Sequence, residues 1–213
     1  MHRWLTFLAF AGLLIMALVS CTPKARIPLN SEGIITQTVY VDEAFTFDEY
    51  IVIKSAADEW KYVSRGVVQF NLIYPYHPSS HTFVGLIDRN IMFKTTASSP
   101  FVIKTDKEIE TDNKKKGIYE TRLTLGFWQL TDVKTNRWFI GLVTDRIVTS
   151  YKLRIVAIHE FGHAVKLQHT DNAVGIMNSS ASFESGCLNR YDAMNFAELY
   201  GYKIDMLNFC LEK

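Results

Sequence analysis

The spacing of hydrophobic and polar positions predicts three helices. Over residues 47–64, apolar side chains fall near one side of a helix and most charged ones fall elsewhere, which predicts an amphipathic helix. Residues 151–167 supply apolar positions along most of their length and form the most strongly predicted helix. Asn189 can cap a last helix that runs to Tyr200, and Gly201 is its stop signal.

Four shorter runs, rich in β-branched and aromatic residues, predict strands. They cover residues 67–74, 84–96, 123–131 and 137–144. The polar stretch between the last two runs predicts a hairpin. The charged residues 104–116 and the segment 170–186 are predicted as loops. A helix followed by strands and then by helices predicts an α+β single domain.

Composition and charge narrow the class of protein. The chain has 213 residues, of which 48% are hydrophobic, so it can bury one core and does not need a second domain. The formal net charge is +1, which gives no electrostatic reason to expect a nucleic-acid partner. No feature of the sequence indicates an oligomer, and we expect a monomer.

The N-terminal residues predict a targeting signal. After Arg3, residues 5–19 form an uncharged apolar run with the length of a signal peptide, too short for a membrane span. The run ends in Leu-Val-Ser-Cys at residues 18–21, which resembles the bacterial lipobox. The resemblance implies that residues 1–20 are removed and that Cys21 becomes a lipidated N-terminus. A plain secretory signal or a membrane anchor with an incidental cysteine are the alternatives.

The lipobox resemblance also sets the expected location and layout. It implies a protein held by acyl chains in the bacterial cell envelope, at the outer membrane if the cell is Gram-negative. Residues 21–45 contain prolines and few large apolar side chains at first, which predicts a tether ahead of a domain over residues 46–213. Export permits a disulfide between Cys187 and Cys210, and two buried thiols are the alternative.

Three histidines and a glutamate have the spacing of a metal site. His159 and His163 are four residues apart on a predicted helix, so both imidazoles lie on one face and can bind one zinc ion. Glu160 points to the side of them, where it can hold a water molecule without being a ligand. His169 can join only if the helix ends between residues 165 and 168. Three histidines and an open fourth position are typical of catalytic zinc.

The pattern resembles a known signature. Residues 159–169 read His-Glu-Phe-Gly-His-Ala-Val-Lys-Leu-Gln-His, which is similar to the zinc signature of the metzincin peptidases. Met177 follows at the distance of the metzincin Met-turn, and the segment up to it is similar to that of the matrixins. The sequence departs from the signature at Lys166, where metzincins usually carry glycine, a residue that tolerates a left-handed backbone.

The resemblance implies a fold and a chemistry. The fold would be a metzincin-like domain with a twisted, mostly parallel sheet, an antiparallel edge strand, a zinc-site helix and a C-terminal helix. One catalytic zinc would lower the pKa of its water, and Glu160 would act as general base. Met177 would be an apolar floor. An extended polypeptide would pair with an edge strand within residues 123–131, and residues 178–186 would wall a side-chain pocket.

Three functions therefore stay open. The first is a membrane-anchored zinc endopeptidase that hydrolyses peptide bonds. The second is a proteolytically inactive zinc-binding envelope lipoprotein on the same scaffold, which Lys166 favours and an intact Glu160 disfavours. The third is an amidase that uses the same zinc-dependent chemistry on a substrate other than protein.

Overall fold

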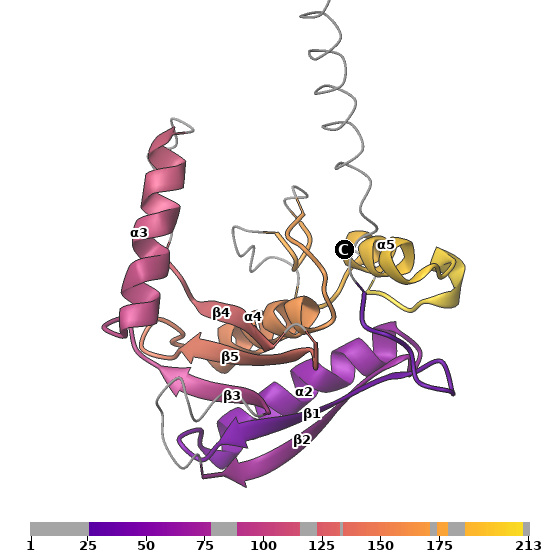
Figure 1. Cartoon of the computed structure of the whole chain (residues 1–213), viewed down its shortest axis with the longest axis horizontal. Coiled ribbons are helices and arrows are strands. Elements are labelled where there is room, and N and C mark those ends of the chain that lie inside the picture. Colours follow the sequence, from indigo (N-terminus) through magenta and orange to yellow (C-terminus); the bar gives the residue numbers. More distant parts are fainter. Residues whose placement is uncertain are drawn as a thin grey trace, which may run out of the picture.

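A five-stranded sheet organises the molecule, in the order β2-β1-β3-β5-β4 (Figure 1). The computed structural model describes residues 26–77, 89–115, 123–132, 134–170, 174–178 and 186–210. The strands are β1 (Ile35–Asp42), β2 (Val68–Tyr76), β3 (Asn90–Thr95), β4 (Gly126–Asp132) and β5 (Arg137–Val143). All neighbouring pairs are parallel except β4 and β5, which form an antiparallel hairpin. The predicted mostly parallel sheet with an antiparallel edge strand is therefore confirmed.

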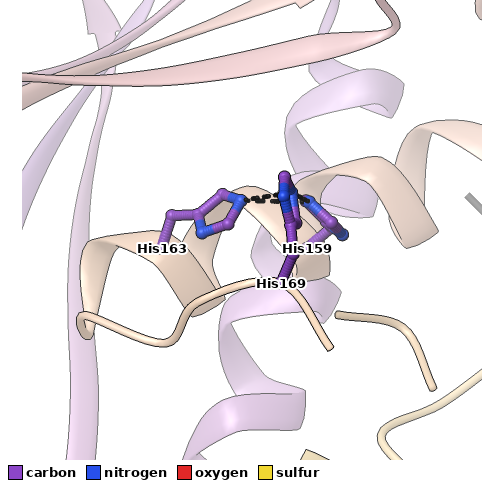
Figure 2. Close-up of side chains that lie close together, drawn as sticks. All are labelled: His159, His163 and His169. Carbon is purple, nitrogen blue, oxygen red and sulfur yellow. Dashed lines mark hydrogen bonds between the residues drawn. The ribbon is translucent and has the colours of Figure 1, made fainter. Parts of the chain in front are cut away.

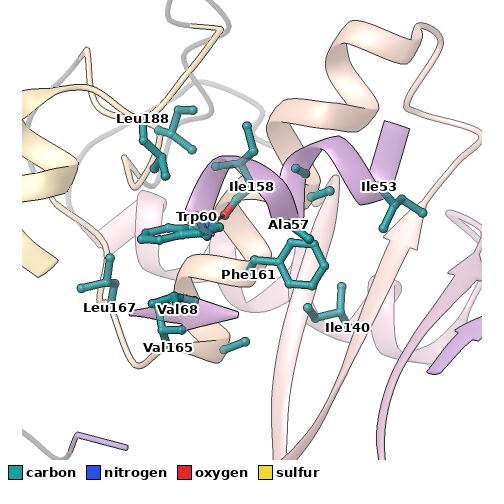
Figure 3. Close-up of a cluster of buried hydrophobic side chains, with 14 of the residues drawn as sticks. Ile53, Ala57, Trp60, Val68, Ile140, Ile158, Phe161, Val165, Leu167 and Leu188 are labelled. Atoms are coloured by element: carbon teal, nitrogen blue, oxygen red, sulfur yellow. Dashed lines mark hydrogen bonds between the residues drawn. The ribbon is translucent and has the colours of Figure 1, made fainter. Parts of the chain in front are cut away.

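Two helices pack on one face of this sheet and bury the main core. They are α2 (Phe47–Val63) and α4 (Ser150–Ala164), and their apolar sides interlock with β1, β2 and β5 (Figure 3). Trp60 and Phe161 are fully buried between the layers, and the indole N–H of Trp60 donates to the carbonyl of Ile158 at 2.9 Å. Each such aromatic side chain contributes about 1.5–3 kcal/mol through burial. This packing holds α4 in place relative to the sheet.

The capping chemistry explains where the predicted helices begin and end. Thr46 and Glu49 form a capping box at the start of α2. Asn189 and Asp192 form another at the start of α5 (Arg190–Tyr200), and Gly201 ends that helix with a left-handed φ of 76°. The predictions for these two helices and for the β4–β5 hairpin are confirmed.

The predicted tether over residues 21–45 is wrong in its second half. Residues 35–42 form β1, an inner strand paired with both β2 and β3. Ile35, Val39 and Val41 belong to the buried core, as does Phe45 after the strand. The folded domain therefore starts well before residue 46. The alternating pattern was obscured because Gln37, a polar residue, occupies an inward position.

The charged segment 104–116, predicted as a loop, belongs to a helix. α3 (Pro100–Lys115) rises from the sheet next to β4 (Figure 1). Its first turn buries Val102, and Phe101 stacks on the ring of Phe127 and meets the ring of Phe139 edge-on. Helical ion pairing between Lys104 and Glu108 supports the exposed part. The prediction failed because the charge of segment 104–116 indicates a solvated loop, whereas the apolar residues that dock this helix, Phe101 and Val102, lie just before that segment.

The C-terminal segment returns to α2 after a short 3-10 turn, Ile204–Met206. Cys187 and Cys210 form a disulfide, and the side-chain amide of Asn208 donates to the carbonyl of Tyr62. The predicted signal peptide, residues 1–20, and the predicted lipidation site, Cys21, lie outside the described residues. No helix in the described part of the chain is long and apolar enough to cross a membrane.

Candidate metal centre

The last turns of α4 carry the candidate ligands, and the chain leaves the helix where a third ligand requires it. α4 ends at Ala164. Lys166 then adopts a left-handed backbone with φ of 68°, which reverses the chain toward His169. For a side chain other than glycine this conformation costs about 1–2 kcal/mol. The turn is therefore made at Lys166 itself, the position where the metzincin signature usually has glycine.

Two buried side chains hold the end of α4. The amide of Gln37 donates to the carbonyl of Ala164 at 3.1 Å, and the hydroxyl of Tyr200 donates to the carbonyl of Val165 at 2.9 Å. Gln37 is itself fixed, because its carbonyl oxygen accepts from the indole of Trp138 at 2.6 Å. Helix ends leave carbonyls without partners, and these two bonds satisfy two of them. They stabilise the turn against the cost of the left-handed Lys166.

Three imidazoles converge on one point (Figure 2). The Nε2 atoms of His159, His163 and His169 form a triangle in which every side measures 3.1 Å. Backbone carbonyl groups orient the first two rings through their other nitrogen. Nδ1 of His159 lies 2.7 Å from the carbonyl oxygen of Ile176, and Nδ1 of His163 lies 2.8 Å from that of Leu167. A carbonyl oxygen only accepts, so each Nδ1 carries the proton and each Nε2 presents a lone pair.

This arrangement fits a metal cation. Burial lowers the pKa of His159 to about 3 and that of His163 to about 4, and it also lowers the pKa of His169. The rings are therefore neutral near pH 7, and the facing Nε2 lone pairs of His159 and His163 repel one another unless a cation lies between them. Tetrahedral zinc bound by imidazoles keeps its ligand nitrogens about 3.3–3.4 Å apart, close to the observed spacing. Second-shell bonds to Nδ1 are the usual way to orient such ligands.

Glu160 lies beside the histidines as a buried carboxyl group. Only 4% of its surface is exposed, and its Oε2 atom has no hydrogen-bond partner among the described residues. Burial raises its pKa to about 8. The backbone of Gly126 on β4 comes so close that a Cβ there would lie 2.6 Å from Oε1 of Glu160. The glycine thus leaves space for this carboxyl group against the edge strand.

Met177 lies next to the end of α4, within a turn to which a buried carboxylate is hydrogen-bonded. Its side chain is fully buried and packs directly against Gly162, where any Cβ would overlap the sulfur. Asp192 accepts hydrogen bonds from the backbone N–H groups of Ile176 and Met177 at 3.0 and 3.1 Å. Because Ile176 also orients His159 through its carbonyl, Asp192 connects α5 to the metal ligands.

Sequence reasoning missed three residues of this centre. Asp192 could have been suspected from its place in an Asn-x-x-Asp capping box, but its bonds to the Met177 turn depend on the fold. Trp128 on β4, whose ring centroid lies 6.3 Å from that of His163, and Gly126 carried no sequence signal for the site. The predicted pocket wall, residues 178–186, lies mostly outside the described residues, which include only 178 and 186 of that segment.

Comparisons with known proteins find one family match. The model of the matrixin family matches residues 56–201, more than half of the chain. Among solved structures, the archaemetzincin of Methanopyrus kandleri is similar, with 12% identity, a TM-score of 0.48, and coverage of 82% of this chain and 99% of that one. No curated protein sequence matches this chain.

Proposed function

Because the chain belongs to the matrixin family of zinc peptidases, we propose that it is a zinc-dependent endopeptidase anchored in a bacterial cell envelope. One observation carries the proposal. The Nε2 atoms of three imidazoles converge on one point, and beside them lies a buried carboxyl group with an oxygen that no described residue satisfies. A purely structural zinc site needs no such carboxyl group, whereas a hydrolytic site needs a base.

Each residue then has a role. His159, His163 and His169 would hold the zinc ion, which when bound would polarise a substrate carbonyl as a Lewis acid and make water more acidic. Glu160 accepts the proton of the attacking water at a carboxylate oxygen and later donates it to the leaving amine nitrogen. Met177, whose side chain is fully buried, would form an apolar floor under the centre.

The substrate would bind along β4. Among the described strands, β4 lies at the edge of the sheet and pairs with β5 alone, so the other side of its backbone would accept an extended polypeptide. Gly126 lies against Glu160 and Trp128 lies near His163, so a peptide on this edge passes over the centre. Main-chain pairing explains how such an enzyme could act on many sequences, with side-chain contacts setting its preferences.

The membrane anchor is a separate part of the proposal. It rests on the lipobox-like Leu-Val-Ser-Cys at residues 18–21 and on the apolar run before it. Replacement of Cys21 by serine should release the protein from the membrane fraction, and metabolic labelling with a fatty acid should mark wild type only. Labelling of the Cys21→Ser variant would contradict the assignment.

The activity is tested by metal content and cleavage together. Purified full-length protein should contain one zinc per chain and cleave an unfolded protein such as reduced casein, and a chelator should abolish cleavage. The Glu160→Gln variant should keep its zinc and lose cleavage, because the ligands remain and the base does not. Stoichiometric zinc without any cleavage by wild type would instead support the inactive zinc-binding lipoprotein. Cleavage of cell-wall amides but not of proteins would support the amidase.

A further inference from the structure

The departure from the zinc signature at Lys166 places a cation at the rim of the metal centre. Its ammonium nitrogen lies 4.9 Å from the ring centroid of Trp128, over the face of the indole. A cation–π contact of this kind holds the amine in place. Lys166 thus connects the turn after α4 to the edge strand along which the substrate is proposed to bind.

This cation is not neutralised by the part of the chain that the structure describes. Lys166 is only partly exposed, yet no carboxylate among the described residues forms an ion pair or hydrogen bond with it. Lys94 and Arg154 are similarly shielded, and each pairs with a glutamate at 2.7 and 3.1 Å. A partly buried charge without a partner is unfavourable unless a ligand supplies one.

The geometry of β4 shows where such a ligand would bind. Side chains at every second position of a strand share a face, so Gly126, Trp128 and Leu130 all face α4. The strand runs from Gly126, beside Glu160, toward Trp128, beside His163. A peptide that pairs antiparallel with β4 runs the other way. Its residues next to Trp128 therefore lie on the amino-terminal side of the bond that is next to Glu160.

We propose that Lys166, held on Trp128, selects substrates with an aspartate or glutamate within about three residues on the amino-terminal side of the scissile bond. The inference rests on the proposed peptidase function and adds a substrate class to it. The carboxylate of the substrate pairs with the ammonium at the rim, and the indole shields the pair from water. Lys166 is in this view a specificity residue and takes no part in bond cleavage.

The test uses three peptide pools that differ only in carrying Glu, Gln or Lys at the three positions before a central bond, and the Glu and Gln pools are compared first. Full-length wild type should cleave the Glu pool with a kcat/KM about tenfold higher, the factor expected for one charged hydrogen bond. The ratio should fall to about one in Lys166→Gly, which folds readily because glycine accepts the left-handed backbone. Lys166→Arg, the matched control, should keep the preference, and Lys166→Glu should move it to pools with Lys.

A binding measurement separates this proposal from the proposed function. Zinc-loaded Glu160→Gln protein should bind the Glu pool about tenfold more tightly than the Gln pool, and Glu160→Gln/Lys166→Gly should bind both alike. If this difference is found although wild type cleaves nothing, the acidic site stands and the peptidase function fails. If wild type cleaves both pools equally, or if Lys166→Gly keeps the preference, Lys166 only stabilises the turn and the inference is overturned.

Discussion

Two carboxyl groups lie almost fully buried near the metal centre, and they differ in how completely they are hydrogen-bonded. Glu160 is 4% exposed and Asp192 is 1% exposed. Asp192 accepts three backbone N–H groups, from Ile176, Met177 and Asn189. The Oε2 atom of Glu160 has no partner among the described residues. One carboxylate is therefore bound into the structure, whereas the other is left with capacity to accept a proton or a hydrogen bond.

The difference shows in their pKa values. Burial raises the pKa of both groups, but the N–H groups around Asp192 act against the rise. Nothing comparable acts on Glu160, and its pKa rises to about 8. Buried polar groups are nearly always hydrogen-bonded, so an unsatisfied one beside converging histidines marks a chemical role. The satisfied carboxylate marks the framework that keeps the ligands in place.

The largest expected effect follows from removing the unsatisfied carboxylate. Glu160→Gln should reduce kcat/KM by about 10²–10⁴-fold, the usual contribution of a general base. Its free energy of unfolding, measured with urea on metal-free protein, should not fall, because the change removes no hydrogen bond to Oε2 and replaces an ionisable group by a neutral one. Glu32→Gln, on an exposed residue, is the control. A clearly destabilised Glu160→Gln protein would show that Glu160 also belongs to the framework.

Replacing Asp192, the hydrogen-bonded carboxylate, should instead lower the stability of the fold. Asp192→Asn should lower the free energy of unfolding by about 2–4 kcal/mol, because an amide nitrogen cannot accept from the N–H groups that face it. Zinc affinity should fall as well, since the Met177 turn also orients His159 through the carbonyl of Ile176. Urea unfolding and competitive zinc titration measure the two effects. Asp205→Asn removes the same charge from an exposed site and should change neither.

Local patterns predicted most of this centre. The spacing of His159, Glu160 and His163 on an apolar stretch predicts a helix face with two ligands, and the structure has that helix. The requirement that the helix end before His169 is also met, by the turn at Lys166. Helix caps at Asn189 and Gly201 were equally readable, because capping depends on residues within one turn of each other.

Features that depend on distant contacts could not be predicted. The sequence predicts a tether at β1 because the inward Gln37 interrupts the apolar alternation, and the partners of Gln37, Trp138 and Ala164, are distant in the sequence. The charge of segment 104–116 predicts a loop, because the docking of α3 depends on Phe127 and Phe139, in strands further along the chain. Likewise the place of Trp128 beside His163 follows from how β4 crosses α4.

A third carboxylate, Asp106, lies nearer the surface, and its replacement should have the smallest effect on stability. Asp106 on α3 pairs with Arg146 at 2.8 Å and accepts the N–H of Thr124 at 2.9 Å, two residues before β4 begins. Unlike the other two carboxyl groups it is 22% exposed. Burial acts to raise the pKa of Asp106, but hydrogen bonds from Arg146 and Thr124 outweigh it and hold the pKa below the ordinary 3.8.

A lowered pKa in the folded state means that this carboxylate stabilises the protein above its unfolded pKa and loses that effect as the pH falls through the folded value. Asp106→Asn should therefore cost about 0.5–1 kcal/mol at pH 7, a typical value for a partly exposed pair. The difference from wild type should shrink between pH 5 and pH 3, as measured by urea unfolding at each pH. A difference that persists unchanged at pH 3 would mean that Asp106 acts through packing. It would then stabilise the entry to β4 without using its charge.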